Sequence, residues 1–272
     1  MNAILYNYFK NWLALNGGKR MNHRVNSYLA AKTDPQNTDL WLPLWIHSRD
    51  TAEVMRCLAI NWLSDGARAA LGLEEAILSK TAYFLGAVHD IGKATVLFQS
   101  NITQHLPEAR ERLTRQCILP ESFVYPRATP HAKASEAILL QLGCPKGLAS
   151  IAGAHHGKPQ ENGQGYIDEN IAEYHDNYYG KGEKDLRFSL WKQMLDQHLQ
   201  DAGFASIEDL PILTIPQELL LTGMLIMADW IASNTSFFPL ISVEDLGSES
   251  LYPKRILNGW ERIHLPDPWQ TL

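Results

Sequence analysis

An adjacent histidine and aspartate, His89 and Asp90, stand at the end of an apolar segment that begins at Phe84. A carboxylate among apolar side chains is costly unless it is paired or bound to a metal. The pair therefore indicates a site built around a cation. An aspartate can bridge two divalent ions with its two oxygens, whereas each neutral imidazole gives one nitrogen to one ion. On a helix, consecutive side chains would point about 100 degrees apart and could approach a metal cluster from two directions.

Asp229 is a second acidic candidate, and its surroundings are even more apolar. It lies in a run of hydrophobic residues that extends from Leu219 to Ala232. The alternative is an aspartate hydrogen-bonded to a serine, a threonine or a backbone amide at a helix junction. We favour a metal ligand, because a charge at this position needs a cation.

Four histidines complete the candidate ligand set, since each lies on or at the end of an apolar segment: His47, His131, His155 and His156. Each alone could be an ordinary core or surface histidine, and only their occurrence together favours a metal site. Gly157 gives the backbone after the doublet the freedom to aim both rings. Lys93 is expected to neutralise charge at a metal-bound phosphate.

The spacing of apolar residues, with capping signals, predicts the helices that position these side chains. They cover residues 50–63, 73–91, 132–142, 148–155 and 219–233. Asp50 and Glu53 predict a capping-box start, and Thr129 predicts a capping hydroxyl ahead of Pro130. Residues 160–184 are polar and predict a surface excursion. The sequence thus predicts an all-α helical bundle around a metal site, with one domain over residues 1–240 and a linker-like segment over 241–272.

Composition limits the function classes. The 272 residues are 45% hydrophobic and carry a net charge of -6, which does not favour a protein that grips duplex DNA over many phosphates. No apolar run reaches membrane-spanning length and no secretory signal is evident, so we expect a cytoplasmic protein without a membrane partner. Three scattered cysteines without a C-x-x-C pair argue against a disulfide framework or a thiolate zinc site.

The ordered set of candidate ligands resembles the HD superfamily of metal-dependent phosphohydrolases. More narrowly, it resembles the HD nuclease domain of the type I CRISPR-associated helicase-nuclease, over roughly residues 30–234. The narrower resemblance rests on local context, which comprises Trp45-Ile46-His47, His89-Asp90-Ile91-Gly92-Lys93, His131-Ala132, Ala154-His155-His156-Gly157 and Ala228-Asp229-Trp230-Ile231-Ala232-Ser233.

The resemblance implies two divalent transition metal ions, with iron, manganese, nickel or cobalt as the candidates. His47, His89, Asp90 and Asp229 would hold one ion, and Asp90, His131, His155 and His156 the other. His89, Asp90 and Lys93 would be the catalytic residues, with Asp90 as the bridge. Lys93 would bind the phosphate, and Ser233 would orient the strand or a ligand near Asp229. The implied substrate is single-stranded DNA, exposed by a helicase domain or subunit and a crRNA-guided surveillance complex.

The chain departs from the full-length family in one respect. It contains no G-x-x-x-x-G-K-[ST] phosphate loop, so no ATP hydrolysis by that route is expected. The segment from Trp260 to Pro266 is similar to the family's connector into the helicase, which leaves open a stand-alone subunit or a part of a longer protein. Two other functions also stay open: an HD phosphohydrolase for a small nucleotide, which the acidic charge suits, and a catalytically idle HD scaffold.

Overall fold

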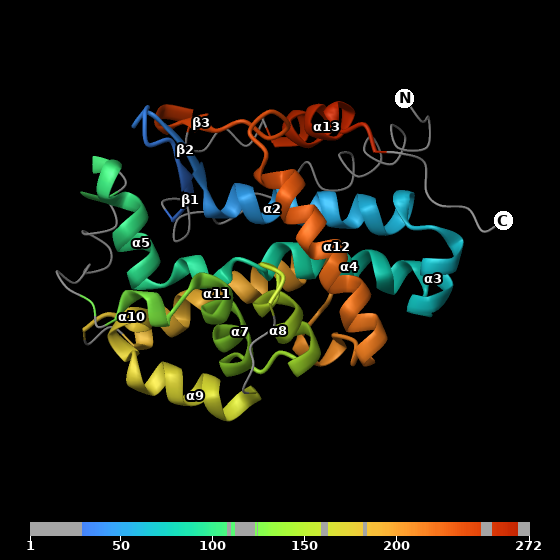
Figure 1. Cartoon of the computed structure of the whole chain (residues 1–272), viewed down its shortest axis with the longest axis horizontal. Helices are drawn as coiled ribbons and strands as arrows, with labels where there is room; N and C mark the ends of the chain where they lie inside the picture. The colour runs from blue at the N-terminus through green and yellow to red at the C-terminus, as the bar shows by residue number, and fades with distance from the viewer. Residues whose placement is uncertain are drawn as a thin grey trace.

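The computed structural model describes residues 29–107, 110–111, 123, 125–158, 163–181, 184–245 and 252–265. Over these residues the protein is mostly helical, with one small sheet at its edge (Figure 1). The predicted helical bundle is therefore confirmed. The α-helices are α2 (Leu44–Cys57), α3 (Asp65–Leu71), α4 (Glu75–Val88), α5 (Val96–Ile102), α7 (His131–Gln141), α8 (Lys146–Gly153), α9 (Gly163–Glu173), α10 (His175–Tyr179), α11 (Lys184–Ala202), α12 (Ile215–Ser233) and α13 (Tyr252–Arg262).

Helices α2 and α4 form the centre of the bundle, and α12 packs against both of them. The two central helices approach most closely at Gly86, where an added Cβ would lie 2.6 Å from Cα of Ala52. Only glycine permits this approach. Because His47 precedes Ala52 on α2 and His89 follows Gly86 at the end of α4, this contact helps to fix the distance between the two histidines.

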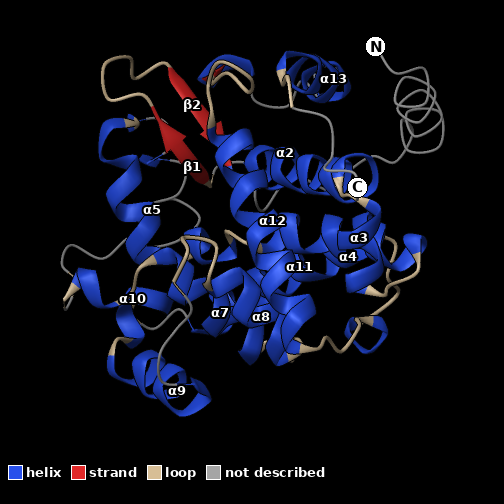
Figure 2. Ribbon diagram, turned by 45° about the vertical axis from the view of Figure 1, so that its right-hand side comes forward, coloured by secondary structure: helices blue, strands red, loops and turns tan. Residues whose placement is uncertain are grey.

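The sheet is antiparallel and has the strand order β1 (Ala30–Thr33), β2 (Leu40–Pro43), β3 (Ile241–Ser242) (Figure 2). The side chain of Gln99 on α5 fastens β1. Its Oε1 accepts the Ala30 N–H at 3.0 Å and its Nε2 donates to the Ala30 carbonyl at 2.9 Å. The sequence analysis did not predict these strands, because they are too short for an alternating pattern to show.

The prediction for residues 160–184 was wrong over the residues that the structure describes. Helices α9 and α10 lie in this range, and Tyr178 and Tyr179 are fully buried. The Nδ2 atom of Asn177 donates to Oγ1 of Thr129 at 3.1 Å, so the hydroxyl expected to cap α7 holds α10 instead. No side chain caps α7, whose N-cap residue is Pro130.

The capping box predicted at Asp50 was also wrong, because α2 already begins at Leu44. Asp50 lies inside the helix, fully buried, and binds the guanidinium of Arg255 on α13 through Nε at 2.9 Å and Nη2 at 2.8 Å. Both views place α13 beside α2 (Figures 1 and 2). The domain division at residue 240 stays a prediction, but β3 and α13 beyond it contact the bundle rather than extend away from it.

Candidate metal centre

The adjacent residues His89 and Asp90 lie just beyond a helix rather than on it. Helix α4 ends at Val88, His89 is its C-cap, and Asp90 (φ -105°, ψ 17°) leads into the 3₁₀ turn Ile91–Ala94. The expected separation of 100 degrees around a helix axis is therefore wrong. The turn instead brings the Nε2 atom of His89 within 3.2 Å of Oδ2 of Asp90.

The two oxygens of Asp90 face two different groups of donors. Oδ2 lies 3.0 Å from Nε2 of His47 and 2.6 Å from Nζ of Lys93. Oδ1 lies 3.5 Å from Nε2 of both His131 and His155. Asp90 thus stands between two clusters of imidazoles, as a bridging ligand must.

The first cluster joins the ends of three helices. His47 comes from α2, His89 and Asp90 follow α4, and Asp229 lies in the last turns of α12. Oδ1 of Asp229 lies 3.3 Å from Nε2 of His47 and accepts a hydrogen bond from Oγ of Ser233 at 2.9 Å. All four members are buried, so water cannot compensate their charges.

The second cluster consists of His131, His155 and His156. His131 opens α7, and the other two follow α8 at a turn that ends on Gly157 with φ 87°. The positive φ is the reason for a glycine here. His155 is buried, whereas His156 is exposed and its Nε2 lies 2.8 Å from Nε2 of His131. The second cluster is therefore the one that opens to solvent.

Backbone carbonyls orient two of the rings. Nδ1 of His89 lies 2.8 Å from the carbonyl oxygen of Gly86, and Nδ1 of His155 lies 2.6 Å from that of Ala152. In the neutral ring, Nδ1–H donates to the carbonyl and Nε2 keeps its lone pair for a metal. Gly92 docks the Asp90 turn onto α7, since its N–H donates to Oγ of Ser135 at 2.9 Å.

In the first cluster, each ionised group is stabilised by neighbouring groups of opposite charge. Burial alone would raise the pKa of Asp90, but Lys93, His89 and His47 hold it well below its usual range. Burial likewise opposes ionisation of Asp229, and the neighbouring imidazoles of His47 and His89 lower its pKa. Although burial opposes protonation of His89, the two carboxylates raise its pKa to about 10. A bound cation would take the place of this proton.

Two imidazoles of the second cluster, those of His131 and His155, are neutral near pH 7. Burial lowers the pKa of His131 to about 4 and that of His155 to about 3. Neutral imidazole is the form that binds metals. His131 and His155 can therefore bind a metal without first losing protons.

The residues fit divalent metal ions on three grounds. Nε2 of His89, Nε2 of His155 and Oδ1 of Asp90 are buried without a hydrogen-bond partner. The donor atoms of each cluster lie within 4.8 Å of one another. Ligands bound at about 2.1 Å from one ion lie roughly 3.0–3.4 Å apart, close to the distances found around Asp90. Mixed imidazole and carboxylate donors suit first-row transition metals.

The structure brings together every candidate ligand that the sequence indicated, although the metal-binding roles stay predictions. Lys93 is buried against Asp90 and over the Phe98 ring, with Nζ 5.6 Å from the ring centroid. Lys32, whose Nζ donates to the Ser233 carbonyl at 2.9 Å, was not among the predicted site residues. Its position on a four-residue strand gave no signal that could have found it.

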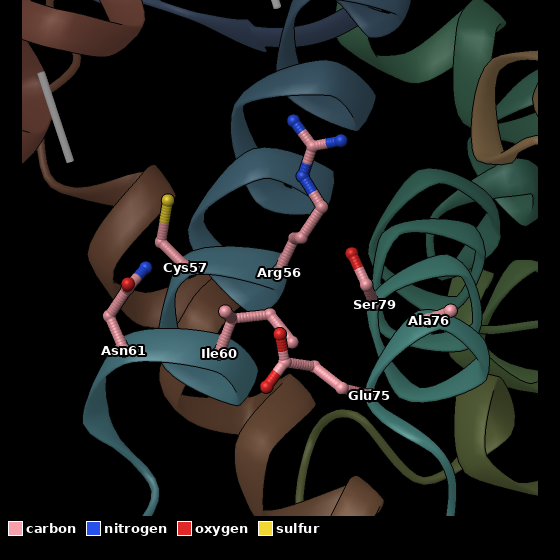
Figure 3. Close-up of a pocket in the computed structure, with 7 residues that line it drawn as sticks. All are labelled: Arg56, Cys57, Ile60, Asn61, Glu75, Ala76 and Ser79. Atoms are coloured by element: carbon pink, nitrogen blue, oxygen red, sulfur yellow. The ribbon is translucent and has the colours of Figure 1, made fainter. Parts of the chain in front are cut away.

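The pocket drawn in Figure 3 is separate from this centre. It has a volume of about 350 Å³ and lies between the end of α2 and the first turns of α4, whereas His47 and His89 lie near the opposite ends of these helices. Burial raises the pKa of the Cys57 thiol in its wall, so this cysteine is not a reactive thiolate. The pocket is lined by Arg56, Cys57, Ile60, Asn61, Glu75, Ala76 and Ser79.

The helix ends of this bundle carry histidines and aspartates in the order His47, His89-Asp90, His131, His155-His156 and Asp229. A helical bundle with this arrangement defines the class of metal-dependent HD-domain proteins. Within this class, the chain belongs to the family of Cas3 HD domains, because the family model "Cas3, HD domain" matches residues 31–238. The chain is 34% identical, over 92% of its length, to the CRISPR-associated nuclease/helicase Cas3 of Streptococcus thermophilus. It spans only 29% of that relative.

Solved structures share the fold. The HD domain of Thermus thermophilus Cas3, crystallised in the presence of Ni²⁺, is 21% identical, with a TM-score of 0.57, over 87% of this chain and 89% of that one. T. fusca Cas3 is 24% identical, with a TM-score of 0.62, over 87% of this chain and 26% of that one. A chain of a pre-nicking CRISPR RNA-guided surveillance complex matches at 24% identity and a TM-score of 0.58, over 87% of this chain and 28% of that one.

Proposed function

We propose that the chain is a two-metal nuclease domain that hydrolyses phosphodiester bonds of single-stranded DNA in CRISPR interference. The observation that carries the proposal is the position of Asp90, whose two oxygens face two separate clusters of imidazoles. A two-metal hydrolase needs a carboxylate in this position, because ions a few ångströms apart must share a ligand.

The residues divide into roles by position. His47, His89, Asp90 and Asp229 would hold one ion, and the second cluster with Asp90 would hold the other. Bound ions would activate water and neutralise charge on the scissile phosphate. Lys93, with its ammonium 2.6 Å from Oδ2 of Asp90, would supply further positive charge. The Ni²⁺ named for the Thermus thermophilus structure supports a transition metal, with iron, manganese and cobalt as the other candidates.

Single-stranded DNA is the proposed substrate because the protein lacks the overall charge for gripping duplex DNA by itself. With a net charge of -6, it needs a partner that delivers the strand. The relative's name includes a helicase, and one structural neighbour is part of a surveillance complex. We propose both as partners in the cytoplasm, where guide RNA rather than this domain supplies sequence specificity.

The outer face of α12 supports a helicase partner. Its large side chains stand in solvent, with Ile215 72%, Leu219 69% and Trp230 70% exposed, although the opposite face packs into the core. α12 is the one helix of the described part that is long and apolar enough to cross a membrane. Because it also carries Asp229 into the centre, we interpret it as a core helix with a second apolar face. We propose that a helicase partner, of the kind included in the relative's name, covers this face.

Cleavage of a labelled circular single strand tests the proposed activity. The reaction is run anaerobically with Mn²⁺, Co²⁺, Ni²⁺ or Fe²⁺, and the Asp90→Asn variant is compared with Asp196→Asn, a surface carboxylate paired with Lys192 at 3.0 Å. We expect the wild-type protein to cleave the strand, Asp90→Asn to abolish cleavage and Asp196→Asn to leave it intact. Full activity of Asp90→Asn would refute it.

Parallel reactions with nucleotide mono-, tri- and cyclic phosphates test the alternatives. Turnover of a nucleotide without strand cleavage would favour a small-molecule phosphohydrolase. No activity and no bound metal in anaerobically prepared protein would favour an idle scaffold.

A further inference from the structure

A second lysine, on the small sheet, is linked to the proposed metal centre through Ser233. Nζ of Lys32 on β1 donates to the carbonyl of Ser233, the last residue of α12, at 2.9 Å. The hydroxyl of the same Ser233 donates to Asp229 at 2.9 Å. One residue therefore links the ammonium of Lys32 to a proposed metal ligand.

The charges around Lys32 place it in the field of both aspartates. Burial and the nearby Lys93 lower the pKa of Lys32, and Asp229 and Asp90 act in the opposite direction. Lys93 is buried against Asp90, whereas Lys32 is only partly buried and is linked to Asp229 through Ser233. The two lysines thus approach the centre from different elements, and Lys32 is the more accessible cation.

The side chain of Gln99 connects the backbone near Lys32 with the backbone of Lys93. Gln99 binds both the N–H and the carbonyl of Ala30, which lies two residues before Lys32. Its Nε2 also donates to the carbonyl of Lys93 at 2.7 Å. Gln99 is fully buried, so this arrangement is rigid. Gln99 therefore fixes the backbone positions from which the two lysines extend, and each ammonium has its own partner, the Ser233 carbonyl for Lys32 and Asp90 for Lys93.

We propose that Lys32 is a strand-binding residue, which holds a phosphate next to the scissile one on the Asp229 side of the centre. The inference rests on the proposed nuclease function. An ammonium has three N–H donors, and the bond to Ser233 uses one, which leaves two for phosphate oxygens. The ligand class is a phosphodiester chain with at least two neighbouring phosphates. A substrate with one phosphodiester would fill the metal centre without reaching Lys32.

The competing role for Lys32 is a structural cap at the end of α12, since lysines often bind the last carbonyls of helices. The chain offers a matched control for this role. Nζ of Lys80 donates to the carbonyl of Gly203, just after α11, at 2.8 Å. Lys80→Met therefore removes the same charge and the same kind of bond at another helix end.

The test compares Lys32→Met, Lys32→Arg and Lys80→Met in the whole chain loaded with Mn²⁺. KM and kcat are measured on a labelled single strand and on bis(p-nitrophenyl) phosphate, together with the salt dependence of strand binding by fluorescence anisotropy. Lys32→Met should raise KM for the strand about tenfold, as expected for a lost charged hydrogen bond. It should also reduce the magnitude of the salt slope by about 0.7. Hydrolysis of the small diester should not change, Lys32→Arg should restore strand binding, and Lys80→Met should resemble the wild type.

Two results would overturn the inference. One is an unchanged KM and salt slope for Lys32→Met in an active protein, and the other is an equal loss on both substrates, as a structural cap predicts. A wild-type protein inactive on both substrates would instead contradict the proposed function itself. A wild type that hydrolyses the small diester but neither binds nor cleaves the strand would contradict the strand as substrate, and the inference with it.

Discussion

Gly92 is the position where the turn that carries Asp90 meets the first turn of α7. A Cβ at this residue would lie 2.1 Å from the carbonyl oxygen of His131 and 2.5 Å from the backbone nitrogen of Ser135. Real Cβ contacts are at least 3.0 Å, so Gly92→Ala must separate the two backbones by about 0.9 Å. Because metal–ligand distances tolerate only about 0.2 Å, His131 would leave the coordination sphere shared with Asp90.

We expect Gly92→Ala to cost about 3 kcal/mol or more in the free energy of unfolding, as an overpacked core does. The metal bound by the second cluster should be lost, and strand cleavage should fall with it. Urea unfolding and elemental analysis of anaerobically prepared protein measure the two effects. Gly223→Ala is the control, since a Cβ there meets nothing within 4 Å. If the Gly92→Ala variant has wild-type stability and a full metal complement, the close packing of Gly92 against the α7 backbone is refuted.

Three further predictions concern the supports of the site. Arg255→Met should destabilise the protein by about 3–5 kcal/mol, because it leaves the buried Asp50 carboxylate unpaired. Adding Asp50→Asn should recover most of this loss in urea unfolding, and an additive double variant would contradict the pairing. Burial lowers the pKa of His198 to about 4, so stability present above pH 6.5 is lost as pH falls toward 4. His198→Gln should reduce the stability difference between pH 7 and 4.5 by about 2 kcal/mol, and an equal pH dependence would contradict this. Ser233→Ala should weaken metal binding about tenfold by freeing Asp229, and unchanged affinity in a metal titration would contradict it.

The sequence was most informative where a residue type conflicted with its surroundings. Asp229 in an apolar run and Asp90 after another could be recognised without a fold, because buried carboxylates need a cation. The structure places both beside His47. Their grouping could be predicted only because several such residues occur together, since spacing along the chain does not show which helix ends meet.

Other features could have been read from the sequence and were not. The buried side chains of α11 recur with helical spacing at Trp191, Leu195 and Leu199, yet the helix was not predicted. Residues 160–184 were predicted to be a surface excursion because most of them are polar. This average polarity does not show that Tyr178 and Tyr179 are buried. A polar segment can still pack when its aromatic residues fall on one side.

The remaining features depend on contacts between distant parts of the chain. The bond from Lys32 to Ser233 joins residues 201 positions apart, and the pair Asp50 and Arg255 joins residues 205 positions apart. Local patterns carry no information about such partners. The capping residue predicted at Asp50 was wrong for this reason, because a buried ion pair gives an aspartate inside a helix another purpose.

The central claim is that Asp90 bridges two metal ions, and anomalous diffraction from crystals grown with Mn²⁺ tests it most directly. The account predicts two anomalous peaks about 3.5–4 Å apart, one on each side of the Asp90 carboxylate. The first should lie among His47, His89 and Asp229, and the second beside His131 and His155. A single peak, or two peaks that share no oxygen of Asp90, would contradict it.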